Sequence, residues 1–391
     1  METIESDDYG GGAFGRSRLT VVFVLNAGSS SVKWRLVDGE TGTTIRGGVV
    51  ERLGHAGADG REHGAVISTL LAGLEHERIA VIGHRVVHGG DRFAAAALIT
   101  DEVEHQIDEL ATLAPLHNSV NLTGIRAARA AFPDIPNVAV FDTAFHRTLP
   151  AASASYALPA DLVQRHQIRR YGFHGISYQH VSARTAELLG RPLSELRLII
   201  FHLGNGASAC AMAGGRSVET SMGMTPLEGL VMGTHAGDLD PGVLLALGRA
   251  GVAWDRLEAL LTRESGLRAL AGTEDMRDIH AAAAAGDARA AAALDVYHHR
   301  LRHYLGAYLA QLGGADAIVF TGGVGENAAA TRAAVVSGMA GLGILIDPAR
   351  NEARADGARA ISDPSSPVAV LIVLTDEELE IARQSLAAVS V

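Results

Sequence analysis

Three segments of the chain run from an apolar stretch directly into a glycine-rich turn. They are VVFVLNAGSSSVKW (residues 21–34), LIIFHLGNGASA (198–209) and AIVFTGGVGEN (317–327). Such an apolar stretch is typical of a buried strand, and the glycines after it permit positive φ and close approach of the backbone to a bulky anion. One such turn is usually only structural. Three of them, with Asn, Ser and Lys interleaved, favour a phosphate-binding site.

Length and composition narrow the class of protein. A chain of 391 residues exceeds the size at which one hydrophobic core stays single, so two domains are expected. The apolar fraction of 48% suffices for a full core, yet no stretch reaches the roughly eighteen apolar residues of a membrane span. The formal net charge of −11, with Lys and Arg scattered, argues against a nucleic-acid surface and favours small-molecule partners.

The chain ends and the cysteine content bear on its location. Cys210 is the only cysteine, and METIESDDYG lacks the basic-then-apolar order of a secretory signal. We therefore expect a cytoplasmic protein without an internal disulfide. Residues 1–18 are acidic and glycine-rich and are expected to form a disordered leader. Seventeen histidines are present, but the absence of HExxH or paired Cys/His spacing argues against a transition-metal site.

Alternation of strand and helix patterns predicts an α/β protein whose second half repeats the first. Strands are expected at residues 21–25, 32–37, 45–51, 79–88, 138–141, 317–320 and 368–375, and near Leu198 and Ala207. Helices are expected at 66–74, 101–113, 176–189, 240–247 and 281–312, and after residue 375. Asp240-Pro241 is a helix start, and Thr375 with Glu378 predicts a capping box for the last helix.

Nine segments together resemble the signature sequences of acetate kinases, members of the acetate and sugar kinase, heat-shock protein and actin superfamily. They are NAGSSSVKW, HRVVHGG, APLHN, FDTAFH, YGFHG, HLGNGAS, SMGMTPLEGLVMGT, FTGGVGEN and TDEEL. The resemblance implies two actin-like (ribonuclease H-like) βββαβαβα domains, residues 19–148 with 378–391 and residues 149–377, with ATP in the cleft between them. It further implies a homodimer, and reversible, Mg²⁺-dependent transfer of the ATP γ-phosphoryl group to acetate, giving acetyl phosphate and ADP.

Transfer between two anions requires donors and cations that converge on phosphate. In the first segment Ser29, Ser31 and backbone amides can donate to phosphate oxygens, and Lys33 supplies a positive charge. A surface hairpin and structural glycines are the competing interpretations of these segments. The resemblance implies a nucleotide- and phosphate-binding set that also contains His117, His202, Leu203, Gly204, Asn205, Gly206, Asp275, Met276, Arg277, Gly323, Val324, Gly325, Glu326 and Asn327.

Magnesium prefers a few oxygen ligands and retains water, so one carboxylate together with substrate phosphates is a sensible site. The resemblance implies Glu377 as the metal-associated glutamate, with Asn26 near the metal and the transferring phosphate; Mn²⁺ would also suit these ligands. The alternative is that Glu377 merely favours the N-terminus of a helix.

The resemblance also implies residues for the reaction itself. Arg85, at the end of a strand, can hold a carboxylate through two points, with a surface ion pair as the alternative. Asp142 corresponds to the family's catalytic aspartate. Because acetate is already ionised near neutral pH, we expect Asp142 to orient groups rather than to remove a proton. His174 is implied to stabilise charge on the moving phosphoryl group.

A small apolar pocket is implied for the substrate methyl group. Its residues would be Val87, Leu116, Phe173 and Pro226, for which ordinary core packing is the alternative. Since one methylene is worth roughly 1 to 3 kcal/mol, acetate and propionate are expected to differ by only about tenfold. A propionate or other short-chain carboxylate kinase therefore stays open as a second interpretation.

One segment departs from the family pattern. Where MGT-Arg-x-GD is expected, the chain reads MGTHAGD, so His235 replaces a transition-state arginine. Histidine is charged only near or below about pH 6.5 and offers one donor at a time, unlike the permanently charged fork of arginine. We expect His235 to act as an imidazolium, with a rate that falls as pH rises. A weakly active or inactive ATP-binding protein is the third interpretation.

Overall fold

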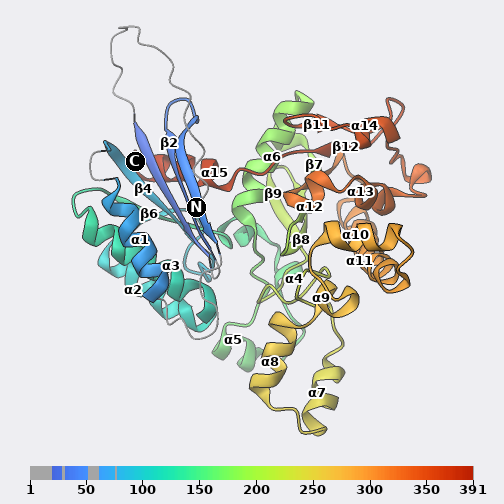
Figure 1. Ribbon diagram of the computed structural model, residues 1–391, viewed down its shortest axis with the longest axis horizontal. Helices are drawn as coiled ribbons and strands as arrows, with labels where there is room; N and C mark the ends of the chain where they lie inside the picture. Colours follow the sequence, from blue (N-terminus) through green and yellow to red (C-terminus); the bar gives the residue numbers. More distant parts are fainter. Residues whose placement is uncertain (1–19, 29–30, 52–60, 75–76, 391) are drawn as a thin grey trace. The chain divides into compact units, whose positions relative to one another are not determined.

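The computed structural model describes residues 20–28, 31–51, 61–74 and 77–390 (Figure 1). The expected leader at 1–18 and the predicted phosphate ligand Ser29 lie outside the described residues. The chain forms two compact units. Unit 1 comprises residues up to Ala144 and those from Asp376 onward, and unit 2 comprises Phe145–Thr375. Both boundaries fall a few residues before the positions expected from the sequence, so that Glu377 belongs to unit 1.

Unit 1 is built on one six-stranded mixed sheet in the order β3-β2-β1-β4-β6-β5. The first three strands form an antiparallel meander, β4 and β6 run parallel to β1, and β5 is a short antiparallel edge. The strands are β1 (Val21–Ala27), β2 (Ser31–Asp38), β3 (Thr44–Glu51), β4 (Ile79–Val86), β5 (Ala97–Leu98) and β6 (Asn137–Phe141). The helices are α1 (Arg61–Ala72), α2 (Asp101–Glu109), the 3-10 turn η1 (Leu110–Thr112), α3 (Pro115–Ala131) and α15 (Glu377–Val389).

Alternation along β1 directs its side chains to two different helical layers. Phe23 and Leu25 pack with Ile67 of α1 and Ala128 of α3 in one hydrophobic core. The opposite face of the sheet carries α15, which contacts β1, β4 and β6. Figure 1 shows α1 and α3 on one side of the unit 1 sheet and α15 on the other. The meander and its buried face confirm the predicted strands.

Helix α3 was not among the helices expected from the sequence. It begins with a proline in its first turn, where the missing N–H costs no hydrogen bond. Its apolar residues Leu122, Ile125 and Ala128 recur at helical spacing and are fully buried. This periodicity was available in the sequence. The helix matters because it supplies polar side chains to the ends of two strands, as described below.

Close packing of α15 on the sheet requires a glycine in β4. A Cβ atom at Gly83 would lie 2.8 Å from Ile381 Cγ2 and closer still to Ser385 Oγ, both on α15. We expect Gly83→Ala to lower the free energy of unfolding by about 2 kcal/mol, because the helix must move outward. Urea denaturation measures this change. Gly64→Ala on α1, where the new Cβ meets only Thr123 Cγ2 at 3.8 Å, is the matched control and should be neutral or stabilising.

Unit 2 repeats the plan of unit 1 in its own six-stranded sheet, in the order β11-β12-β10-β7-β8-β9. An antiparallel meander is again followed by two strands parallel to its first strand, with a short antiparallel edge. The strands are β7 (Arg197–Leu203), β8 (Ala207–Ala213), β9 (Arg216–Thr220), β10 (Ala317–Thr321), β11 (Arg359–Ala360) and β12 (Ala369–Ile372). This repetition confirms the two-domain α/β fold expected from the sequence.

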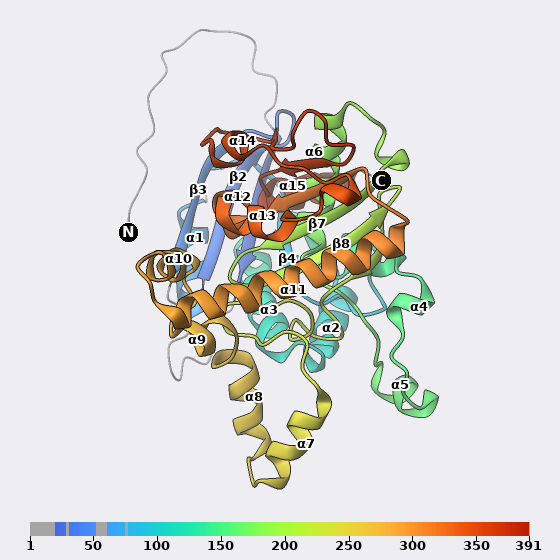
Figure 2. The ribbon, with the colours of Figure 1, turned by 90° about the vertical axis from the view of Figure 1, so that its right-hand side faces the viewer.

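The helices of unit 2 include a long one that crosses the unit, α11, with α9 and α10 packed near its start (Figure 2). Apart from the 3-10 turns η2 (Ala144–Thr148), η3 (Leu193–Glu195) and η4 (Ala340–Leu342), they are α4 (Ala151–Ala154), α5 (Ala160–His166), α6 (Gly175–Leu189), α7 (Pro241–Arg249), α8 (Trp254–Arg263), α9 (Gly266–Ala271), α10 (Met276–Ala284), α11 (Ala288–Leu312), α12 (Gly322–Asn327), α13 (Ala329–Val336) and α14 (Pro348–Glu352).

Three local predictions are wrong. The single helix expected at 281–312 is two helices, because Gly286 takes a positive φ and Asp287 caps α11 by accepting from Arg289 N. The last helix is capped by Asp376, which accepts from Leu379 N, and not by a Thr375/Glu378 capping box. The segment GGVGEN forms the short helix α12 instead of an open turn. The predicted cap of α7 by Asp240 is confirmed.

Buried histidines couple the stability of both units to pH. Burial lowers the pKa of His84 in unit 1 and of His146 in unit 2 from 6.5 to about 4. The unfolded chain therefore takes up these protons at a higher pH than the folded chain, and stability falls as pH drops from about 6.5 toward 4. We expect each histidine to cost about 2 kcal/mol at pH 5 relative to pH 7. Urea denaturation across this window, with His84→Gln flattening the slope, checks the prediction.

Candidate active site

The carboxyl ends of the parallel strands β1, β4 and β6 bring three predicted site residues of unit 1 together. Asn26 lies near the end of β1, Arg85 near the end of β4, and Asp142 directly after β6. Arg85 pairs in register with Val140, so Asp142, two residues further on, lies on the same face of the sheet. Arg85 Nε donates to Asp142 Oδ1 at 3.3 Å, and Arg85 Nη2 contacts Asp142 Oδ2.

The Arg85–Asp142 pair is largely withdrawn from water. The Asp142 side chain is 2% exposed and that of Arg85 is 18% exposed. Burial raises the pKa of Asp142, although the Arg85 charge acts in the opposite direction. Burial also disfavours charge on Arg85, but Asp142 and Glu377 oppose it and leave the pKa of Arg85 raised. Arg85 is therefore a permanent cation at the carboxyl end of β4, with two donors directed to one carboxylate.

The N-terminus of α15 adds carboxylates to the same face. Burial raises the pKa of Glu377 to about 7; Arg85 lowers it, and Asp142 and Glu378 raise it further. Arg35 of β2 balances the flanking acids, since its Nη1 donates to Asp376 Oδ1 at 2.6 Å and its Nη2 to Glu378 Oε2 at 3.4 Å. Sequence reasoning named the exposed Lys33 but missed Arg35. Their spacing of two along β2, which places both on one face, was the available signal.

Side chains of α1 and α3 hold the loops that carry this cluster. Asn121 of α3 donates to Ala27 O at 2.7 Å and accepts from Val87 N at 3.1 Å, which joins the ends of β1 and β4. Asn118 forms two hydrogen bonds with the backbone of His88: its Oδ1 accepts from His88 N at 3.0 Å, and its Nδ2 donates to His88 O at 3.0 Å. His63 of α1 bonds to Gly28 O at 3.1 Å. None of these three positioning residues was assigned a role from the sequence.

In unit 2, the predicted phosphate-binding loop and two predicted histidines lie close together: His202 is near the end of β7, and His174 directly precedes α6. The loop Gly204–Gly206 joins β7 to β8, and the rings of His174 and His202 stack beside it with centroids 4.3 Å apart. His174 Nδ1 bonds to Ser208 Oγ at 2.8 Å. His174 also has φ of +59°, a left-handed conformation that is uncommon outside glycine and is found at functional sites.

Two glycines let other segments approach this loop closely. Gly322 has a φ of +76°, and a Cβ atom added at this residue would lie only 2.8 Å from Leu203 O. A Cβ at Gly233 would overlap Asn205 Oδ1, and Gly233 N donates to Asn205 O at 2.9 Å. The end of β7, the start of α12 and the segment around Gly233 therefore meet at the predicted phosphate loop. These segments approach one another so closely that Gly322 and Gly233 cannot be replaced by residues with a side chain unless the backbone moves.

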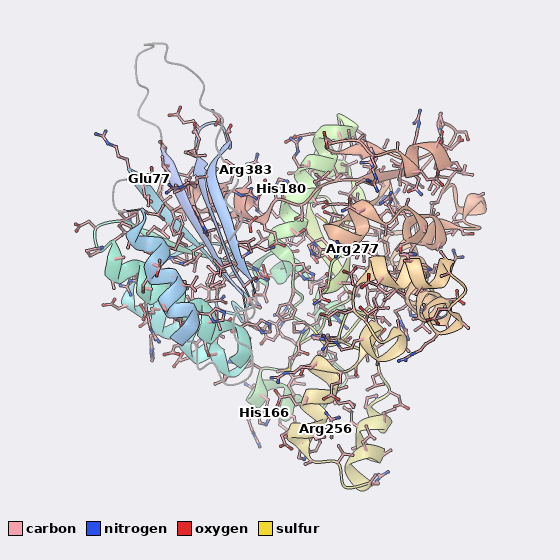
Figure 3. The ribbon with its side chains drawn as sticks, viewed as in Figure 1. Glu77, His166, His180, Arg256, Arg277 and Arg383 are labelled. Carbon is pink, nitrogen blue, oxygen red and sulfur yellow. The ribbon has the colours of Figure 1, made fainter. Side chains whose placement is uncertain are left out.

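The predicted adenosine-binding residues occupy the first turn of α10 and the whole of α12. Asp275 caps α10 and pairs with Arg277, which lowers the pKa of Asp275 to about 2. Arg277, labelled in Figure 3, has a side chain that is 90% exposed, whereas Met276 is buried. In α12, which begins at Gly322, Gly323 and Val324 lie in the first turn, Gly325 is buried, and Asn327 donates to Gly323 O at 2.9 Å. Glu326 instead serves the fold, accepting from Gly322 N and Thr375 N.

Arg332 of α13 fixes α12 from within. Its side chain is fully buried and donates to Gly325 O at 2.8 Å, to Glu326 O at 2.9 Å and to Asn351. We expect Arg332→Lys to cost about 2 kcal/mol of stability, because an ammonium cannot reach all of these acceptors. If α12 forms a nucleotide surface, the Kd for ATP should also rise several-fold. Urea denaturation and calorimetric ATP titration measure the two effects; Arg191→Lys, at an exposed ion pair with Asp316, is the control.

The residues expected around the substrate methyl group are divided between the units. Val87 is buried in unit 1. His117, which was predicted for the phosphate site, also belongs to unit 1 and lies on α3. The side chain of Leu116 lies outside the described residues. Phe173 and Pro226 belong to unit 2, where Phe173 is buried and its carbonyl accepts from His146 Nε2 at 2.9 Å. Each unit thus carries part of the predicted set.

Comparison with known proteins decides the family. Residues 61–383 match the model of the acetokinase family. The chain belongs to the acetokinase family. A curated relative, the acetate kinase of Leifsonia xyli subsp. xyli, is 54% identical over 95% of this chain and 100% of its own length.

Solved structures of the family share the fold. The crystal structure of Porphyromonas gingivalis acetate kinase has a TM-score of 0.89 at 41% identity, covering 95% of this chain and 100% of that chain. A propionate kinase from Francisella tularensis subsp. tularensis has a TM-score of 0.87 at 36% identity, covering 94% and 100%. Acetokinase-family membership confirms the resemblance read from the motifs. In the part of the chain that the structure describes, no helix is long and apolar enough to cross a membrane.

His235 is the position at which this acetokinase-family chain departs from the expected pattern, and its hydrogen bonds define its tautomer. Thr234 Oγ1 donates to Thr262 O at 3.1 Å, since a carbonyl can only accept. The hydroxyl has one proton, so its 3.0 Å bond with His235 Nδ1 must be donated by the imidazole. Neutral His235 therefore presents a lone pair, not a proton, at Nε2. Burial lowers its pKa, which works against the imidazolium expected from the sequence.

Proposed function

We propose that this protein transfers the γ-phosphoryl group of ATP to acetate, reversibly and with Mg²⁺, to give acetyl phosphate and ADP. The observation that carries the proposal is the pairing of partly buried Arg85 with buried Asp142 at the carboxyl ends of three parallel strands, beside the carboxylate of Glu377. In parallel sheets this edge is where ligands bind. Family membership supports the same reaction.

Arg85 would bind the acetate carboxylate through two donors, with Asp142 fixing the plane of the guanidinium. Because acetate is ionised at neutral pH, the reaction requires no general base. What the residues supply is orientation of the carboxylate oxygen in line with the leaving group and compensation of charge. Asp142 is suited to this part, since its oxygens already accept from Arg85 Nε and Nη2.

The donor set at α15 fits a hard divalent cation. Glu377 would contribute a carboxylate and Asn26 an amide oxygen, and Mg²⁺ commonly takes one or two protein oxygens together with phosphate and water. Among the described residues, no three His, Cys, Asp or Glu side chains converge into a metal cage. A site completed by the nucleotide is consistent with that arrangement. The bound cation, Mg²⁺ or Mn²⁺, would neutralise phosphate charge.

Unit 2 would bind the nucleotide. The backbone amides of Asn205 and Gly206, in the β7–β8 loop, would donate to phosphate oxygens, and His174, which lies beside Gly206, would stabilise charge on the moving phosphoryl group. Its left-handed backbone and its bond to Ser208 hold the ring in one orientation. The first turn of α10 and the exposed part of α12 would contact the adenosine.

Propionate is the second candidate acid. Support comes from the family, since a propionate kinase shares this fold at 36% identity. Support also comes from two of the residues expected around the substrate methyl group, Val87 and Phe173, since apolar side chains distinguish acids that differ by one methylene only weakly.

A hydroxamate assay for acyl phosphate tests the proposal and separates the acids. Purified protein with MgATP is given acetate, propionate or butyrate between about pH 5.5 and 8.5. Strong product with acetate is the expected result. Product only with a longer acid would identify a different carboxylate kinase, and ATP binding without any product would identify an inactive member of the family.

We also propose that the protein is a homodimer, with the projecting pair α7 and α8 in the interface. Figure 2 shows both helices extending away from the unit 2 sheet, and Figure 3 labels Arg256 on α8. Helix α7 has no buried residue, and Leu245 and Trp254 are 57% and 77% exposed. Light scattering should give twice the mass of the chain, and Leu245→Glu should give the monomer. A monomeric wild type would contradict the proposal.

A further inference from the structure

The segment between β9 and α7 begins with residues 221–229, which we call the loop, and these carry Pro226, one of the residues expected to line the acyl pocket. Three side chains meet beside this loop. Glu228 belongs to the loop, and Tyr156 and Arg170 come from earlier segments of unit 2. Tyr156 Oη donates to Glu228 Oε2, and Arg170 Nη2 donates to Glu228 Oε1 at 2.5 Å. The guanidinium of Arg170 lies over the Tyr156 ring, 5.6 Å from its centroid. We call these three residues the clamp.

The clamp is bonded to the loop backbone along its first half. Arg170 Nη1 donates to Ser221 O at 3.3 Å and to Met222 O at 3.1 Å, and Tyr156 Oη accepts from Met224 N at 3.0 Å. A Cβ at Gly223 would overlap both Tyr156 Oη and Glu228 Oε2, so only glycine allows the chain to pass between them. The Tyr156 hydroxyl therefore uses its one proton and accepts one bond, and both Glu228 oxygens are engaged.

The same loop holds the segment that carries the other pocket residue of unit 2. Gly223 O accepts from Tyr171 N at 3.0 Å and from Gly172 N at 3.2 Å, immediately before Phe173. Arg170 is the residue before Tyr171, so one side chain and two backbone amides join this segment to the loop. The spacing between Phe173 and Pro226 is thus set by bonds that involve the clamp and Gly223.

We propose that Tyr156, Arg170 and Glu228 are positioning residues that determine how strictly the enzyme selects its acid by chain length. An apolar pocket distinguishes two acids that differ by one methylene through a small difference in binding energy. That difference is lost when a wall of the pocket can move outward to accommodate the longer acid. A satisfied polar network with 16% exposure at Arg170 resists that movement. The clamp touches neither phosphate-site histidine in the bonds described above, so it acts on selectivity more than on nucleotide binding. This inference rests on the proposed function.

Two conservative variants test it in the full-length protein. Tyr156→Phe removes the hydrogen bonds to Glu228 and Met224 N and leaves the Arg170–Glu228 pair intact. Glu228→Gln weakens the bonds of residue 228 with both Tyr156 and Arg170. For each, kcat and KM are measured with acetate, propionate and butyrate, and KM is measured for MgATP. We expect the ratio of kcat/KM between the preferred acid and the acid one methylene longer to fall at least fivefold, mainly through KM. The KM for MgATP should stay within about twofold.

Tyr171→Phe is the matched control, because it also removes a tyrosine hydroxyl bond from the same segment, to Gln167 O at 2.8 Å, and leaves the backbone bond from Tyr171 N to Gly223 O in place. It should leave the acid ratio unchanged. An unchanged ratio in Tyr156→Phe, with the variant folded by circular dichroism, overturns the inference. So does an equal loss for every acid and for MgATP, which would identify a general structural role. A wild type that makes no acyl phosphate from any acid overturns the proposed function itself, and this inference with it.

Discussion

Arg85→Ala is expected to lower kcat/KM for acetate by about a thousandfold or more while leaving KM for MgATP within a few-fold. Arg85 is the partly buried cation paired with Asp142, and the proposed reaction uses its two donors to place the acetate carboxylate. A loss of this size corresponds to about 4 kcal/mol of transition-state stabilisation. The hydroxamate assay with varied acetate, and separately with varied ATP, measures both parameters.

Stability must be separated from catalysis in this experiment. Removing Arg85 leaves Asp142 buried without its cation, which commonly costs about 3 kcal/mol and would raise the pKa of Asp142 further. The double variant Arg85→Ala/Asp142→Asn removes the unpaired charge and should recover stability without recovering activity. Arg85→Lys keeps the charge but loses the two-point contact, so an intermediate rate is expected. Full turnover with an unaltered acetate KM in the Ala variant would show that the pair is only structural.

His235→Arg is expected to raise turnover, by about a hundredfold at pH 8. Neutral His235 carries a lone pair at Nε2, because its proton is on Nδ1 and is donated to Thr234, and a lone pair repels a phosphate oxygen. Only the imidazolium can donate from Nε2. An arginine would offer charge and two donors at every pH used, and single donors to transition-state charge are worth about a hundredfold or more.

The pH profile gives the sign of the effect. Burial lowers the pKa of His235 below 6.5, so the imidazolium fraction, and with it the wild-type rate, should fall as pH rises through that pKa. The ratio of the Arg variant's rate to the wild-type rate should therefore increase with pH between about 6 and 8. His235→Gln, which lacks a titrating charge, should be slow at every pH. A slower Arg variant with an unchanged profile would contradict the role of His235 as a cation.

The candidate site illustrates which residues sequence reasoning reaches. Arg85, Asp142 and Glu377 were found because they stand in recognisable motifs at strand and helix ends, and the structure brings them to one face of unit 1. Arg35, Asn118 and Arg332 were missed. Arg35 follows NAGSSSVKW directly and Asn118 ends APLHN, but neither residue type indicates its partner, which lies 341 and 30 positions away. Arg332 stands outside the quoted motifs, and its bonds to Gly325 O and to Asn351 depend on how α12, α13 and α14 pack.

Periodicity and turn chemistry are local properties, and they alone determined much of this protein. The buried strands, the repeated α/β plan, the Asp240 cap and the family motifs depend on residues within a few positions of one another. Tertiary packing decided the rest. The cap of α15 at Asp376, the tautomer of His235 and the clamp around Gly223 depend on single hydrogen bonds and on space between distant segments. Such bonds differ by about 1 kcal/mol, too little to leave a periodic pattern in the sequence.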